Sequence, residues 1–203
     1  MLGTKEVMIR LALIGNHRSE YNEHAASRLH EACFVAIADC DSERATASAK
    51  IVGASIIADS IEELLAKHSN EFDAVVIRNT QSPHLVAGSA ADAGKHVLIE
   101  SSLASSTELA DAVIEKCRAA NVRLMVGHSK RFLPAVATIK SVLDSGVLGA
   151  PGLLRIHHWE SSDSNNRLAR HRVSSEMDLA IWLFSELPSQ IYALVRGPVA
   201  TAV

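Results

Sequence analysis

The feature that most constrains the fold is the alternation of short apolar runs with longer amphipathic runs over the first 127 residues. The apolar runs have the length of single strands, and the amphipathic runs have the length of helices. Strands that are apolar throughout, rather than at every second residue, are typical of parallel sheets covered by helices on both faces. The pattern therefore predicts an α/β fold with a Rossmann-like, doubly wound parallel sheet and right-handed connections.

The expected elements follow from the positions of these runs and from local stop signals. Ser60 followed by Glu63 has the pattern of a capping box, and Gly53 is a typical helix stop. The expected strands cover residues 8–14, 33–39, 55–59, 72–78, 96–100 and 122–127, and the expected helices cover 22–31, 42–53, 60–68, 83–94 and 106–121.

The carboxyl ends of these strands are where a ligand is expected, because open α/β sheets bind ligands where the strand order reverses. This rule selects four short segments, which are residues 15–20, 39–42, 78–84 and 100–103.

After about residue 128 the pattern changes, so we expect two domains. Residues 1–127 are expected to form a Rossmann-like dinucleotide-binding domain, and residues 128–203 a truncated α+β segment. Its expected elements are a helix at 134–146, a strand at 152–160, a loop at 161–172, a helix at 176–187 and a strand at 189–197. Two strands alone leave exposed edges, which predicts a homo-oligomer such as a dimer formed through these strands, or their burial against another chain.

Composition excludes several classes of function. The chain has 203 residues, 48% of them hydrophobic and 21% charged, with a net charge of −3 and no cluster of basic residues. These values predict a globular protein that binds neither nucleic acid nor membranes. Three cysteines at unrelated spacings are typical of reduced thiols in a cytoplasmic protein. The sequence has neither a C-x-x-C nor an H-E-x-x-H motif, so no metal site is expected.

The segment LALIGNHRSE, residues 11–20, runs from an apolar strand through Gly15 and Asn16 into an expected helix. A dinucleotide cradle has three glycines at this turn, but His17 and Glu20 occupy the second and third places. Two interpretations remain open. In one, a reshaped loop contacts phosphate through His17 or Arg18; in the other, the loop no longer binds a dinucleotide. The residues favour weak or absent NAD binding, because His17 fills phosphate space and Glu20 competes with the phosphate charge.

Asp39 ends the second strand, 24 residues after Gly15. A carboxylate there can accept hydrogen bonds from the adenosine ribose and repels a 2′-phosphate, which favours NAD over NADP. An equally good interpretation makes Asp39 a turn or helix N-cap residue in the segment ADCDSE.

Several stretches together resemble the glucose–fructose oxidoreductase / inositol dehydrogenase / MocA (Gfo/Idh/MocA) family of NAD(P)-dependent oxidoreductases. The resemblance implies a Rossmann domain, then a larger α/β domain whose open sheet commonly mediates oligomer contacts, and a sugar or polyol ligand. The stretches are AIADCDSERA (36–45), FDAVVIRNTQSPH (72–84), AGKHVLIESSLASS (93–106), LMVGHSKRFLP (124–134), LDSGVLGAPGLLR (143–155) and EMDLAIWL (176–183).

The resemblance implies further cofactor contacts after the fourth strand. The family segment A-T-P-N-x-x-H falls on residues 78–84, so Asn79, Thr80 and His84 are candidate cofactor contacts, with His84 near the ribose. The proline has moved to Pro83, and Arg78 stands where the family has a small apolar residue. We expect Arg78 either to plug the pocket or to pair with Glu20 or Glu100.

The family's catalytic groups are not matched. Its E-K-P motif becomes Glu100, Ser101 and Ser102, which leaves Glu100 as a cofactor-site candidate without the lysine. Its D-x-x-x-H pair falls on His171 and Ser175. No catalytic residue is therefore assigned. The expected function is that of a catalytically impaired oxidoreductase-like protein with a regulatory or assembly role. The alternatives are an active NAD-dependent sugar or polyol dehydrogenase with rearranged groups, and a purely structural oligomerisation module.

Overall fold

The structure is a computed structural model, and it is described here for residues 8–15, 30–78, 80, 82–100, 102–150, 152–157, 166–196 and 199–202. For residues 166–172 and 193–202 only the backbone is described. The chain divides into two compact units, Met1–Gly127 and His128–Val203. Each unit is described by itself.

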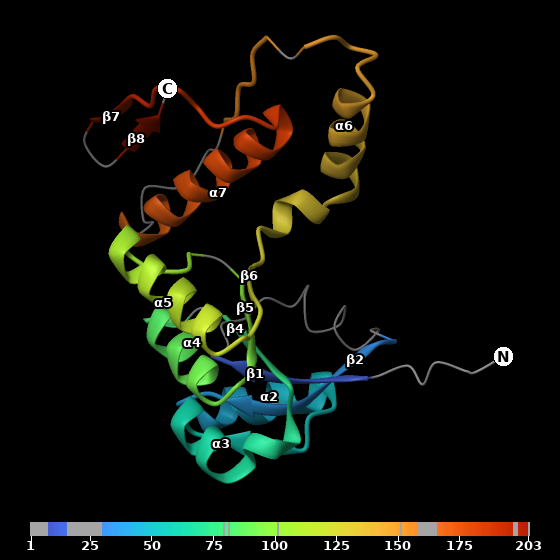
Figure 1. Cartoon of the computed structure of the whole chain (residues 1–203), viewed down its shortest axis with the longest axis vertical. Helices are drawn as coiled ribbons and strands as arrows, with labels where there is room; N and C mark the ends of the chain where they lie inside the picture. Colours follow the sequence, from blue (N-terminus) through green and yellow to red (C-terminus); the bar gives the residue numbers. More distant parts are fainter. Residues whose placement is uncertain are drawn as a thin grey trace, which may run out of the picture. The chain divides into compact units, whose positions relative to one another are not determined.

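Unit 1 is built on a six-stranded sheet in the order β3-β2-β1-β4-β5-β6 (Figure 1). Every neighbouring pair is parallel, and the order reverses between β1 and β4. The predicted doubly wound parallel sheet is therefore confirmed. The strands are β1 (Ile9–Ile14), β2 (Ala32–Ala38), β3 (Ile56–Ala58), β4 (Ala74–Ile77), β5 (His96–Ile99) and β6 (Leu124–Val126).

Helices cover both faces of this sheet, which explains why its strands are apolar throughout. One face packs against α3, α4 and α5 in a core that includes Ile14, Phe72 and Val113, and the other packs against α2 around Leu13 and Ile37. The helices are α2 (Ser42–Val52), α3 (Ile61–His68), α4 (Pro83–Asp92) and α5 (Thr107–Ala119), with a short 3₁₀ turn η1 (Ser69–Glu71) after α3.

The helix boundaries follow the local signals. Ser60 caps α3, because its Oγ accepts the backbone N–H of Glu63 at 3.2 Å. Gly53 ends α2 in the left-handed conformation with φ 77. Both boundaries confirm the predicted cap and stop. The predicted helix at 22–31 falls mostly outside the described residues. The predicted C-terminal end of this helix is wrong, because residues 30–31 form bends that lead directly into β2 at Ala32.

The described residues of unit 2 form a 3₁₀ helix and two α-helices, which are η2 (Ser129–Phe132), α6 (Pro134–Asp144) and α7 (Asn166–Phe184). A separate antiparallel hairpin joins β7 (Ala193–Arg196) to β8 (Val199–Ala202). No described helix of either unit is long and apolar enough to cross a membrane.

Three expectations for unit 2 are wrong in part. Residues 152–157 of the predicted strand are irregular and exposed, because no described strand lies beside them to pair with. The predicted loop at 161–172 is helical from Asn166, where Leu, Ala and Arg are strong helix formers. The strand predicted at 189–197 is confined to β7, which pairs with β8 instead of joining a broader sheet.

Candidate functional site

Gly15 lies at the carboxyl end of β1, next to the point where the strand order reverses. Its N–H donates to the carbonyl oxygen of Ala38 at 2.8 Å, and its φ is +70°. A Cβ atom here would lie 2.5 Å from the carbonyl oxygen of Arg78 and 2.8 Å from Cγ2 of Thr80. Only glycine therefore fits, and the backbones of β1 and the β4 end approach closely. The predicted partners Asn16 and His17 lie outside the described residues, as do Arg18 and Glu20.

Two buried polar atoms near the end of β4 have no partner. Oγ1 of Thr80 and Nδ1 of His84 are buried and make no hydrogen bond within the described part of the chain. Native proteins pair almost all buried polar atoms, so such orphans mark places where a ligand or ordered water binds. Thr80 also lies against Gly15. The structure thus brings Gly15 and Thr80 together, while Asn79 falls outside the described residues. That these residues contact a cofactor stays a prediction.

Asp39 is buried at the end of β2, with 6% of its surface exposed. Its Oδ1 accepts the Asp41 N–H at 2.9 Å and Nη2 of Arg44 at 2.8 Å. The N-cap of α2 is Asp41, so the helix-cap interpretation of Asp39 is wrong and the turn interpretation is right. The hydrogen bond to Asp39 raises the pKa of Arg44. Contact between Asp39 and a ribose stays a prediction.

Arg78 and Glu100 form an ion pair across the ends of β4 and β5. Nε of Arg78 donates to Oε2 of Glu100 at 2.8 Å, and the two side chains are 7% and 34% exposed. The sequence left three roles open for Arg78, which were filling the pocket, pairing with Glu20 and pairing with Glu100. Among the described residues, Arg78 pairs with Glu100. The sequence alone named both Glu20 and Glu100 as possible partners of Arg78. The choice between them needed the strand order, which places β5 beside β4.

The turn after Glu100 differs from the one that the family motif implies. Ser102 stands at the proline position and has φ 44, a value that a proline ring cannot adopt. Ser101, at the lysine position, lies outside the described residues. The backbone at Ser102 is therefore one that the E-K-P motif could not adopt at its proline.

Unit 2 holds a cluster of ion pairs that sequence reasoning missed. Asp178 accepts hydrogen bonds from Arg131 and lies 3.1 Å from Nδ1 of His128, while Lys130 pairs with Glu176. Ser175, at the family's histidine position, is half-buried on α7, and the side chain of His171 is outside the described residues. No short motif signals the His128–Asp178 contact, because it depends on packing between η2 and α7.

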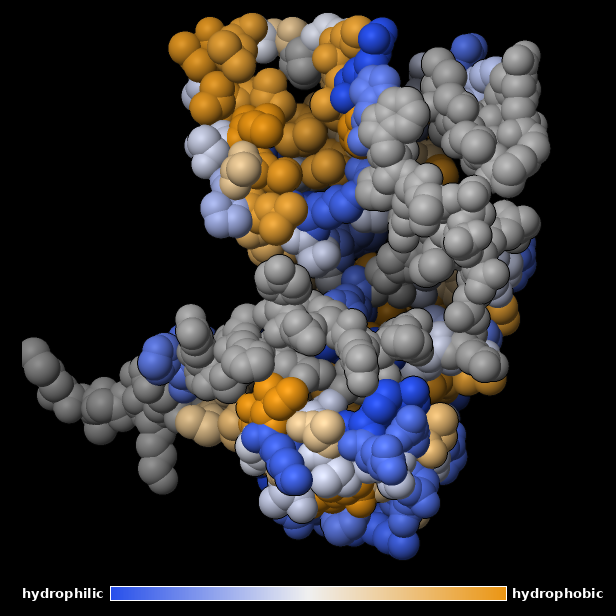
Figure 2. Space-filling view, turned by 180° about the vertical axis from the view of Figure 1, so that it is seen from behind, coloured by the Kyte–Doolittle hydropathy of each residue, from blue (hydrophilic) through white to orange (hydrophobic). Residues whose placement is uncertain are grey.

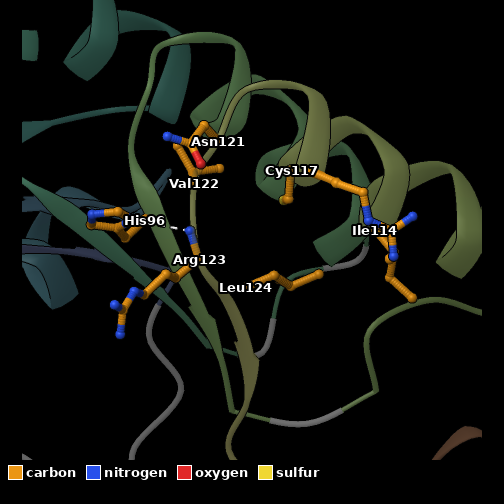
Figure 3. Close-up of a pocket in the computed structure, with 8 residues that line it drawn as sticks. His96, Ile114, Cys117, Asn121, Val122, Arg123 and Leu124 are labelled. Carbon is orange, nitrogen blue, oxygen red and sulfur yellow. Dashed lines mark hydrogen bonds between the residues drawn. The ribbon is translucent and has the colours of Figure 1, made fainter.

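A separate cavity of about 550 Å³ lies between α5 and the amino ends of β5 and β6 (Figure 3). The N–H of Arg123 donates to Nδ1 of His96 at 3.0 Å on its wall, and Cys117 and Arg118 line it from α5. The cavity is at the opposite strand ends from Gly15, so it is separate from the candidate site. Among the described residues, no group of three or more His, Cys, Asp or Glu side chains is placed to hold a metal ion.

The sequence of unit 1, which holds the residues around Gly15, matches a known protein family. Residues 9–128 match the GFO_IDH_MocA oxidoreductase family, described as having an NAD-binding Rossmann fold. The resemblance inferred from the sequence is thereby confirmed.

Individual relatives extend the similarity into unit 2. Inositol 2-dehydrogenase 4 of Saccharopolyspora erythraea is 32% identical over 99% of this chain, which spans 60% of that enzyme. A putative myo-inositol dehydrogenase structure from Sinorhizobium meliloti 1021 is 26% identical with a TM-score of 0.78, over 91% of this chain and 58% of that one. An Agrobacterium radiobacter oxidoreductase in complex with NAD+, L-tartaric acid and magnesium is 28% identical with a TM-score of 0.65, over 70% and 42% of the two chains.

Proposed function

The chain belongs to the Gfo/Idh/MocA oxidoreductase family, and from that premise we propose that it binds NAD but lacks the family's proton-transfer chemistry. Its role is then that of a pseudo-oxidoreductase with a regulatory or assembly function. The chain spans about 60% of the relative from Saccharopolyspora erythraea, so activity and substrate are part of the proposal.

Support for NAD binding comes from the geometry around Gly15. A tight left-handed glycine ends β1, next to the point where the strand order reverses, and it lies against Thr80. Oγ1 of Thr80 and Nδ1 of His84 are buried without a partner in the described part of the chain. The point where the strand order reverses is the place where doubly wound sheets receive a dinucleotide. Asp39 would accept a ribose hydroxyl there, and Gly15 would let the backbone approach the diphosphate. Missing glycines at residues 17 and 20 argue for weak affinity.

The proposed loss of catalysis rests on one observation, which is that the positively charged residue paired with Glu100 is an arginine. Where the family motif has lysine, this chain has Ser101, and the guanidinium of Arg78 pairs with Glu100 instead. A guanidinium does not release its proton in proteins, so it can hold a charge but cannot relay a proton. An unassisted serine is equally unsuited to proton transfer at neutral pH.

Binding and turnover are tested separately. NADH fluorescence is expected to report weak binding to the wild-type chain and none to Gly15→Ala, because the added Cβ meets the Arg78 carbonyl. Gly53→Ala is the matched control, since its φ is also left-handed but nothing lies within 4 Å of the new atom. We expect no NAD reduction over a panel of inositols, polyols and sugars. Turnover at ordinary enzyme rates would contradict the pseudoenzyme assignment.

A second candidate function is an active NAD-dependent dehydrogenase for a sugar or polyol, and the His128–Asp178 contact favours it. A carboxylate beside a histidine fixes the orientation of the ring and is a common arrangement for a general base. If this function holds, substrate oxidation is measurable and His128→Asn removes it, while NADH binding persists.

We also propose that the chain forms a homo-oligomer through unit 2 and works in the cytoplasm. Helix α6 contains no buried residue although it is rich in apolar side chains, which leaves its surface available for a second copy. Cys33, Cys40 and Cys117 are free thiols, which suits a reducing compartment. A small sugar-like ligand is the proposed effector, by analogy with the inositol dehydrogenases.

A further inference from the structure

Arg78 is a largely buried cation whose described side-chain hydrogen bond involves Nε alone. Its side chain is 7% exposed, and its one described side-chain partner, Glu100, engages Nε. A guanidinium carries five N–H donors, and the side-chain hydrogen bond described for Arg78 uses only the one on Nε. Nη1 and Nη2 are not among the fully buried atoms without a partner, so they keep some contact with solvent. The Nη1 and Nη2 donors are therefore available to an acceptor that enters from solvent.

Two residues that follow Arg78 carry buried polar atoms for which the described part of the chain offers no partner. These atoms are Oγ1 of Thr80, two residues further on, and Nδ1 of His84. Both atoms can donate a proton, depending on the hydroxyl rotamer and the ring tautomer. The segment from the end of β4 to the first turn of α4 thus carries a fixed positive charge and two further potential donors. Acceptor-only groups, which are the oxygens of carboxylates and phosphates, match such a set.

We propose that Arg78 is an anion-binding residue whose Nη1 and Nη2 groups bind two oxygens of one carboxylate or phosphate. Glu100 then acts as a positioning residue that holds Nε and fixes the plane of the guanidinium. The anion has two potential sources, which are the diphosphate of the dinucleotide and the carboxylate of a small organic acid. Only the first source rests on the proposed NAD binding.

The test measures thermal stabilisation by inorganic pyrophosphate, by malonate and by NADH, each against sodium chloride at equal ionic strength. Wild-type protein is expected to respond to at least one of the first two. Arg78→Met should abolish that response, and Arg78→Lys should weaken the affinity about tenfold, the loss expected from one charge-assisted hydrogen bond. Arg118→Met, an exposed arginine on α5, is the matched control and should respond as the wild type does.

The variant Glu100→Gln is expected to bind anions more tightly than the wild type. Removing the competing carboxylate should strengthen anion binding several-fold, and a misfolded protein cannot produce a gain. A response confined to pyrophosphate and NADH identifies the cofactor diphosphate as the source, and a response to malonate identifies an organic acid.

The inference and the proposed function fail in different ways. An unchanged anion response in Arg78→Met, or no response of the folded wild type to either anion, overturns the inference even if NADH binds. Absence of NADH binding overturns the proposed cofactor, while a malonate response that depends on Arg78 still supports the inference.

Discussion

Asp73 shows how a single side chain joins the two strands between which the sheet order reverses. It precedes β4, and its Oδ2 accepts both the backbone N–H and Nε of Arg10 on β1, at 2.9 and 3.1 Å. Its Oδ1 accepts Nη2 of the same arginine at 2.6 Å. The hydrogen bonds from Arg10 hold the pKa of Asp73 below the usual range of an aspartate. The ionised carboxylate therefore stabilises the folded state.

The pH dependence follows from the sign of this shift. A carboxyl group whose pKa is lower when folded adds stability above its unfolded pKa, about 4, and loses it as pH falls through the folded value. We expect wild type to exceed Asp73→Asn in stability at pH 7 and this difference to shrink as pH falls below about 4. Urea unfolding at several pH values measures it. Asp111→Asn, at an exposed position on α5, is the control. A difference that does not change with pH would contradict the assignment.

Helix α3 illustrates how an element begins at a residue chosen by local chemistry. Oγ of Ser60 accepts the Glu63 N–H, and Oε2 of Glu63 accepts the Asp59 N–H at 2.9 Å. Two backbone donors at the start of the helix are thereby satisfied. The returning hydrogen bond comes from Asp59, one residue before the cap, rather than from Ser60 itself. Packing of Ile61 and Leu64 then buries the apolar face of the helix.

Replacing Ser60 with alanine is expected to cost about 1 kcal/mol, because one backbone N–H loses its acceptor. In a domain of this size, that corresponds to a fall in the melting temperature of about 2–4 °C. Calorimetry of the unit 1 transition measures the change. Ser105→Ala changes an exposed serine next to the cap of α5 and should leave the melting temperature unaltered. An equal fall in the melting temperature of the two variants would show that the Ser60 cap does not stabilise α3.

The whole molecule presents an unusually apolar surface on unit 2. Figure 2 shows hydrophobic side chains gathered over α6 and the segment that follows it. The exposed residues on this surface include Ile139, Val147, Leu148, Leu153 and Ile156. Monomeric proteins seldom expose contiguous apolar surface of this kind, whereas homodimer interfaces are rich in it.

We therefore expect the chain to self-associate at micromolar concentration, as measured by light scattering after size exclusion. Leu148→Glu and Leu153→Glu should shift the protein to monomer, because each would bury a carboxylate in the interface. Ile51→Glu, at an exposed position of α2 in unit 1, should leave the oligomeric state unchanged. A wild-type chain that stays monomeric over a hundredfold range of concentration would refute the proposal.

Unit 1 was predictable because its signals are local. Apolar runs such as residues 74–77 are buried on one face of the sheet and half-buried on the other, and caps such as Ser60 act within one helical turn. Gly15 was also recognisable, because a strand that ends in glycine before a helix needs a left-handed turn. The strand 152–160 was not predictable in this way. Alternating residues make a strand only when another strand satisfies the backbone, and no described strand does so for residues 152–157.

The sequence by itself determined which residues stand at the strand ends, since hydrophobic periodicity and turn residues depend only on near neighbours. Only the tertiary structure decided which of them meet. Arg78 meets Glu100 across 22 residues, and His128 meets Asp178 through the packing of η2 against α7. The physical reason is that an ion pair needs two groups within a few ångströms. That separation is set by the parallel order of β4 and β5 and by helix packing, and no local pattern records it.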